Sequence, residues 1–146
     1  MKAYPLNKTD VSALMLEHGI TPTLQRVEIA QILFAKPQHL SAENVLNMVN
    51  KTSIQVSKAT VYNTLGLFAK EGLIREVIVD PTKVFYDPTT VPHHHFYNVD
   101  TGSLTDIDAD TVVLERLPDL PHGTIAAGVD VIIRVRSEQK PGDNLR

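Results

Sequence analysis

The sequence contains no cysteine, no apolar run long enough to cross a bilayer and no strong excess of either charge. Without cysteine the chain forms no disulfide, no thiolate-bound zinc site and no cysteine nucleophile. Residues 1–5 lack the apolar core of a signal peptide, so we expect a cytoplasmic protein with no membrane partner. Residues 1–90 hold nine Lys and Arg against eight Asp and Glu, and residues 91–146 hold five against nine. This uneven distribution indicates two parts with different roles.

Three consecutive histidines, His93, His94 and His95, follow a stretch that contains two prolines. Residues 96–99 come next and are rich in aromatic and β-branched side chains, which favour a strand. Side chains alternate between the two faces of a strand. We therefore expect His93 and His95 to share one face and His94 to lie on the other.

A turn and a second strand follow the histidines. If residues 101–102 form a two-residue hairpin loop, Asp106 pairs with Tyr97 and Asp108 pairs with His95. Two imidazoles and a carboxylate on one face form a candidate site for a divalent metal. The alternatives are a solvated polar edge strand and the remnant of a purification tag, although histidines inside a patterned hairpin argue against a tag.

The first part of the chain contains several helix starts, each with a capping residue before an apolar-periodic segment. The expected N-caps are Asp10, Thr21, Ser41 and Ser57. The expected helices cover residues 11–18, residues 22–35, the segment after Ser41, and residues 58–71. A β-hairpin follows, with strands at residues 76–79 and 83–86 and a proline in the turn between them.

Helices followed by a two-stranded hairpin predict a winged helix-turn-helix, whose last helix enters the major groove of DNA. One face of that helix carries hydrogen-bonding and planar groups and no large aliphatic side chain. We expect base contacts from Lys58, Tyr62 and Asn63, and phosphate contacts from Arg26, Thr60 and Lys83. The alternative is a plain three-helix domain with a solvated face, in which Tyr62 is a half-buried core residue.

Residues 91–136 predict two strands, a short helix that starts at Asp110 or Thr111 and contains residues 112–117, and a final strand at residues 129–136. A unit of this size buries too little apolar surface to be stable alone. Pairing with a second copy supplies the missing contacts and suits a two-fold DNA site. The expected fold class is therefore α+β, with a winged helix-turn-helix domain and a small C-terminal α/β dimerisation domain.

Over residues 14–136 the chain resembles the ferric uptake regulator (Fur) family. The motifs that carry the resemblance are residues 19–26 (GITPTLQR), 39–43 (HLSAE), 58–62 (KATVY), 84–86 (VFY) and the histidine hairpin. Within the hairpin, residues 93–102 (HHHFYNVDTG) look like the iron response regulator (Irr) branch, which senses heme.

The resemblance implies a DNA-binding domain over residues 1–87, a hinge at residues 88–92, and a dimerisation and ligand-sensing domain over residues 93–146. It also implies that both domains hold one regulatory metal, which fixes the angle between the reading helices of a dimer on double-stranded operator DNA. The ligands carried over from the family are His39, Asp87, His93, His95 and Asp106. The implied ions are Fe²⁺ or Mn²⁺, with Zn²⁺ as a substitute in purified protein. The implied heme ligands are His93, His94 and His95.

The chain also departs from the family pattern. Asn98 and Thr101 stand where many members have a Cys-x-x-Cys pair, so the structural zinc is absent and the dimer depends on apolar packing of residues 129–135. Asn63 replaces a frequent arginine beside the reading tyrosine, so a different operator is expected. The rival function is a metal-dependent hydrolase that uses the His and Asp cluster. No general acid or base is evident near the histidines, so we expect a regulator and not an enzyme.

Overall fold

The computed structural model describes residues 3–52 and 54–139 and divides the chain into two compact units, Met1–Thr90 and Val91–Arg146. The boundary falls inside residues 88–92, but a hinge at these residues stays a prediction. The outer ends of the two predicted domains, residues 1–2 and 140–146, lie outside the described residues. None of the helices in the described ranges combines the length and the apolar character needed to span a membrane.

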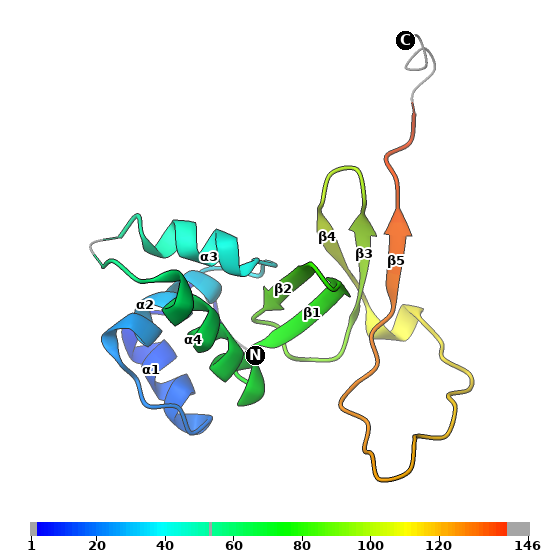
Figure 1. Cartoon of the computed structure of the whole chain (residues 1–146), viewed down its shortest axis with the longest axis horizontal. Helices are drawn as coiled ribbons and strands as arrows, with labels where there is room; N and C mark the ends of the chain where they lie inside the picture. The colour runs from blue at the N-terminus through cyan, green and yellow to red at the C-terminus, as the bar shows by residue number, and fades with distance from the viewer. Residues whose placement is uncertain (1–2, 53, 140–146) are drawn as a thin grey trace. The chain divides into compact units, whose positions relative to one another are not determined.

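Four helices build the first unit (Figure 1): α1 (Lys8–Glu17), α2 (Leu24–Leu33), α3 (Ala42–Val49) and α4 (Lys58–Lys70). Their apolar faces meet in one core, and its largest fully buried side chains include Phe34, Phe68 and Met15. Each such side chain contributes about 1.5–3 kcal/mol through burial. The core fixes the side of α4 that faces inward, and therefore also the side that faces solvent.

Side-chain caps define where the helices begin. Ser41 caps α3 and Ser57 caps α4, each accepting a hydrogen bond at 3.1 Å from the backbone N–H three residues later. The first two predicted caps are wrong. Asn7 caps α1, and Asp10 instead closes a reciprocal capping box from the third helical position. Thr23, rather than Thr21, caps α2. Both threonines fit the sequence signature, so the pattern alone did not distinguish them.

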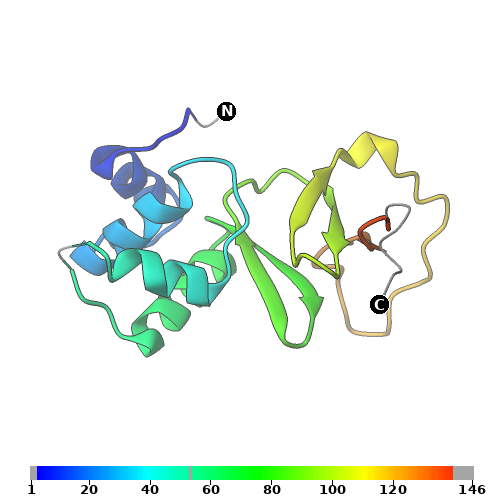
Figure 2. The same cartoon turned by 90° about the horizontal axis from the view of Figure 1, so that it is seen from above.

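The wing consists of β1 (Arg75–Asp80) and β2 (Lys83–Asp87), which pair antiparallel beside the helices (Figure 2). In its turn the Asp80 carboxylate accepts hydrogen bonds from the hydroxyl and the backbone N–H of Thr82, at 2.8 and 2.7 Å, which lowers the pKa of Asp80. Two backbone hydrogen bonds, of 3.1 and 2.7 Å, also join Leu40 to Tyr86. The segment before α3 is thereby fixed to the wing.

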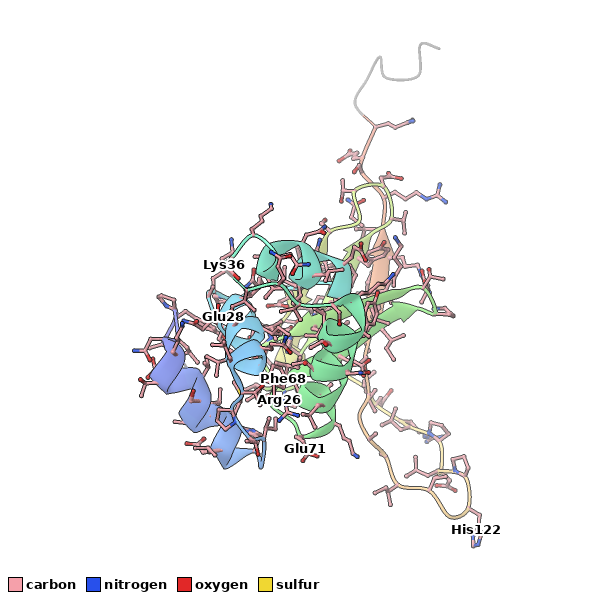
Figure 3. All side chains as sticks on the ribbon, turned by 60° about the vertical axis from the view of Figure 1, so that its left-hand side comes forward. Arg26, Glu28, Lys36, Phe68, Glu71 and His122 are labelled. Carbon is pink, nitrogen blue, oxygen red and sulfur yellow. The ribbon has the colours of Figure 1, made fainter. Side chains whose placement is uncertain are left out.

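The second unit contains a three-stranded sheet with the order β4-β3-β5 (Figure 1). Strand β3 (His94–Asn98) pairs antiparallel with β4 (Leu104–Ile107) and parallel with β5 (Ile132–Val135). A short 3₁₀ helix, η1 (Ala109–Thr111), follows β4. Residues 112–131 have no regular structure and make a wide loop, with His122 near its far end (Figure 3).

The predicted helix over residues 112–117 is wrong, because helical backbone ends at η1 and Val112 is already extended at φ −113° and ψ 116°. Only six residues separate η1 from Pro118, and a helix this short is not stable without packing. The residue before a proline is also biased away from helical backbone. The predicted strand at residues 129–136 is present but shorter, as β5.

Candidate metal centre and nucleic-acid interface

The histidine hairpin has a different register from the expected one. A loop of only residues 101–102 would pair Asp106 with Tyr97, whereas β3 and β4 pair Asp106 with His95. The loop is longer because the Asn98 side chain accepts hydrogen bonds from two backbone N–H groups of the loop, at 2.9 and 3.1 Å. The expected two-residue loop is therefore wrong.

The register error amounts to two residues, so the side chains keep their faces of the sheet. Asp106 lies directly opposite His95 and shares its face. Asp108, which we expected opposite His95, lies beyond the end of β4 and is exposed. Only one of the two candidate aspartates therefore reaches the histidines.

The imidazoles of His93 and His95 converge on one carboxylate oxygen. His93 Nε2 lies 3.3 Å from Asp106 Oδ1 and His95 Nε2 lies 3.4 Å from the same atom. The two ring centroids are 4.6 Å apart. Both imidazoles are buried, whereas the Asp106 side chain is about half exposed. The unit thus gathers two nitrogen donors and one oxygen donor at one point.

A backbone carbonyl constrains the protonation of His93. The carbonyl oxygen of Val91 lies 2.7 Å from His93 Nδ1 and can only accept a hydrogen bond, so Nδ1 carries a proton. In the neutral ring the Nε2 lone pair then points at the Asp106 oxygen, and the two lone pairs repel. A proton on Nε2 or a cation between the atoms removes this repulsion. A carbonyl that fixes the tautomer in this way is typical of metal-binding histidines.

His94 is buried on the other face of β3. Its Nδ1 accepts a hydrogen bond of 3.0 Å from the backbone N–H of Val131. In the neutral ring the proton is therefore on Nε2, which then has no lone pair to give to heme iron. The three expected heme ligands are thus not equivalent, because only His93 and His95 direct Nε2 to a common point.

His39 and Asp87 form an imidazole–carboxylate pair within the first unit. His39 Nε2 lies 3.1 Å from Asp87 Oδ2, while the other oxygen of Asp87 accepts a hydrogen bond of 2.9 Å from the Thr89 backbone. The pair is held together because the next residue after His39 and the residue before Asp87 form the Leu40–Tyr86 bridge. No pattern in the sequence singled out His39, which was named only through the family resemblance.

Imidazole nitrogen and carboxylate oxygen suit Fe²⁺, Mn²⁺ and Zn²⁺. The second unit offers three such donors on one face of its sheet, and the first unit offers two. The residues present therefore fit a divalent cation by their chemistry and by the constrained tautomer of His93. Binding of a metal by these residues stays a prediction.

The predicted DNA-contacting side chains all lie in the first unit. Lys58, Tyr62 and Asn63 are exposed on α4, and the ammonium group of Lys58 lies 5.8 Å from the centre of the Tyr62 ring. Burial raises the pKa of the neighbouring Tyr86, and Glu76 and Tyr62 raise it further. The Tyr86 phenol therefore remains a neutral hydrogen-bonding group at physiological pH.

Two recesses flank α4. One, of about 280 Å³, separates α4 from the start of α2 and is lined by Thr23, Gln25, Arg26, Thr60, Asn63, Thr64 and Leu67. The other, of about 460 Å³, separates α4 from the wing and is lined by Ser41, Ala42, Glu43, Tyr62 and the wing residues 81–86. The structure thus groups Arg26 with Thr60 and Asn63, and Lys83 with Tyr62. The sequence did not identify Gln25 and Thr64 as lining residues of this recess, because their position there depends on how α2 packs on α4.

A winged helix-turn-helix, together with paired imidazole and carboxylate groups, is typical of DNA-binding transcription regulators that respond to metal ions. The family model "Ferric uptake regulator family" matches residues 17–119, and the chain belongs to this family. Members of the family regulate transcription and are not enzymes, so the hydrolase alternative is not supported.

The relatives agree with this assignment. The chain is 31% identical to the ferric uptake regulation protein of Synechococcus elongatus over 107 residues, which cover 70% of this chain and 73% of that protein. It is 35% identical to the Pseudomonas aeruginosa protein over 95 residues, which cover 63% and 71%. A structure of the ferric uptake regulator from P. aeruginosa with manganese matches with a TM-score of 0.66 and 27% identity, over 88% of this chain and 98% of that one.

Proposed function

We propose that this protein is a dimeric transcription regulator of iron and heme homeostasis, similar to the Irr branch, that binds operator DNA in the cytoplasm. Its DNA affinity depends on a divalent cation, Fe²⁺ or Mn²⁺, held by His93, His95 and Asp106. The observation that carries the proposal is the convergence of two buried Nε2 atoms on one oxygen of Asp106, at 3.3 and 3.4 Å.

His39 and Asp87 are proposed as additional ligands of the same cation, on the basis of the family resemblance. Through the Leu40–Tyr86 bridge this pair is connected directly to the wing and to the start of α3. A ligand changes the conformation of a protein only to the extent that it binds one arrangement better than another. Ligands on both sides of residues 88–92 give the cation such a preference.

Heme is the second candidate ligand, supported by the three adjacent histidines and by the likeness of residues 93–102 to the Irr branch. Heme iron requires an axial donor such as imidazole. His93 and His95 direct Nε2 to the Asp106 carboxylate, whereas His94 Nδ1 accepts a hydrogen bond from the backbone N–H of Val131. We therefore assign axial ligation to His93 or His95, and His94 contributes only if its bond to Val131 is broken.

The test is a DNA-binding titration on a duplex selected by the protein from a random library. Protein stripped with a chelator and protein loaded with Mn²⁺ are compared at several salt concentrations, because phosphate contacts make affinity depend on salt. We expect wild-type affinity to differ by roughly 5- to 150-fold between the two forms. The double variant His93→Ala, His95→Ala should show no such difference and should bind less Mn²⁺ in calorimetry.

The same samples are titrated with heme and followed by absorption spectroscopy. A heme complex that is lost in the double variant but kept in His94→Ala supports the ligand assignment. If the double variant still responds normally to both Mn²⁺ and heme on DNA, the proposed site is wrong. If a His39→Ala variant binds Mn²⁺ and responds to it like the wild-type protein, the first unit contributes no ligand. The assignment of His93, His95 and Asp106 is then unaffected.

A further inference from the structure

Tyr62 and Asn63 are neighbours on α4, and the sequence predicts that both contact bases, but they line different recesses. Tyr62 lines the recess on the wing side, and Asn63 lines the recess on the α2 side. Successive residues of a helix are about 100° apart, so Asn63 projects about 100° away from Tyr62 but only about 60° away from Thr60. Asn63 therefore belongs with Thr60, at the flank of the helix rather than with Tyr62.

The recess on the α2 side has the composition of a site for an anion. Its lining offers a guanidinium, two amides and hydroxyl groups, and it includes no carboxylate. Arg26 donates one hydrogen bond, of 2.9 Å, to the carbonyl oxygen of Thr21, and forms no ion pair with a carboxylate of the described residues. A guanidinium has five N–H donors, so most of them are available to a ligand in the recess.

The hydroxyl and amide groups of the lining also have hydrogen-bond donors that a ligand could use. Ser57 Oγ donates to Thr60 Oγ1 at 2.9 Å, so Thr60 is already an acceptor and its own proton is available to donate. Asn63 makes no side-chain hydrogen bond within the described part of the chain, and its amide therefore has two unused donors. Thr64, only 6% exposed, lies at the most buried part of the lining.

The dimensions of DNA indicate what reaches this recess. The major groove of B-DNA is about 12 Å wide, and an α-helix with its side chains is about 10–12 Å across. A helix that lies in the groove therefore has a sugar-phosphate backbone along each flank. The α2-side recess is on one such flank, and Arg26 beside it is labelled in Figure 3.

We propose that Asn63 binds a backbone phosphate of the operator in the α2-side recess, together with Arg26 and Thr60, and does not read a base. This inference rests on the proposed function only in that the protein binds operator DNA. It departs from the expectation that Asn63 faces bases, and it leaves direct base reading to the Tyr62 side of α4. The occupant is a DNA phosphate because the recess offers donors and a positive charge and opens beside the exposed face of α4.

The experiment compares two duplexes of equal length, one selected from a random library by the wild-type protein and one with the same bases scrambled. Phosphates are the same in both duplexes, whereas base contacts are not. We expect Asn63→Ala to weaken binding to both by the same factor, roughly tenfold or more, since hydrogen bonds to charged groups are the stronger ones. A new selection with this variant should recover the wild-type consensus.

Asn63→Asp keeps the size of the side chain and places a carboxylate in the recess, so we expect a larger loss, again equal on both duplexes. The matched control is Asn47→Ala, because Asn47 is exposed on α3 and lines neither recess. Tyr62→Ala should instead change the selected consensus.

A consensus that changes in Asn63→Ala, or unchanged affinity of this variant for both duplexes, overturns the inference. Either result leaves the proposed function intact if the wild-type protein still binds DNA in a metal-dependent way. If the wild-type protein selects no duplex at all, the inference and the proposed function both fail.

Discussion

At the scale of single residues, the candidate metal centre depends on which carboxylate faces the histidines. Asp106 lies opposite His95 and within 3.4 Å of both imidazoles, while Asp108 lies two residues further along and is exposed. We expect Asp106→Asn to weaken Mn²⁺ binding, measured by calorimetry, by at least the 10- to 100-fold that loss of an outer partner costs a metal site. The substitution keeps the side-chain volume, removes the charge and replaces one carboxylate oxygen with an amide NH₂ group.

Asp108→Asn is the matched control, because it removes the same charge from the same segment without changing a group near His95. It should bind Mn²⁺ as the wild-type protein does. If the two variants lose affinity equally, the effect is one of general charge, and Asp106 is not a ligand.

At the scale of elements, α4 depends on a cap that the sequence predicted correctly. Ser57 Oγ accepts from the Thr60 backbone N–H and donates to the Thr60 hydroxyl, at 3.1 and 2.9 Å. We expect Ser57→Ala to lower the free energy of unfolding by about 1 kcal/mol, measured by urea denaturation, because a backbone donor loses its partner. The same change releases the Thr60 side chain beside the α2-side recess.

Ser57→Asp serves as the rescue, since aspartate is an equally good cap and its charge is favoured at a helix N-terminus. Its stability should be close to that of the wild-type protein. Equal destabilisation by both variants would mean that the hydroxyl contributes through packing and not through the cap.

Elements with strong local signals were predictable from the sequence. Local sequence determines the caps Ser41 and Ser57, the wing turn at residues 81–82 and the strand that contains His94 and His95. The absent helix at residues 112–117 shows where such signals fail. Its apolar residues suggested a helical face, but Pro118 limits its length and no packed surface compensates.

The part of the candidate site that depends on the alternation of side chains between the two faces of a strand was predictable from the sequence. The predicted register of the hairpin is wrong by two residues. Asp106 still lies on the same face as His95, because side chains alternate with a period of two. His39 was different, since its partner Asp87 is 48 residues away in the sequence. The bridge between Leu40 and Tyr86 brings the two together, and no local sequence pattern predicts such a contact.

At the scale of the whole molecule, exposed apolar side chains are concentrated in the smaller unit. Of the fifteen large hydrophobic residues exposed in the described ranges, ten lie beyond residue 90, including Val113, Ile125 and Ile133. Strand β5 is an edge of the sheet and pairs only with β3 among the described strands. Exposed edges and apolar patches of this kind are typical of surfaces that bind another chain. We expect a second copy as the partner, because a dimer suits a two-fold DNA site.

Ile133→Asp tests this directly, because Ile133 is 41% exposed on β5 and a carboxylate there is costly to bury against a second copy. We expect the dissociation constant of the dimer, measured by sedimentation, to rise at least tenfold, which corresponds to about 1.4 kcal/mol. Operator affinity should fall with it, since a monomer reaches only one half-site. Leu16→Asp is the control, because Leu16 is 64% exposed on α1 in the other unit. If Ile133→Asp dimerises like the wild-type protein, or if Leu16→Asp dissociates equally, the dimer does not form through β5.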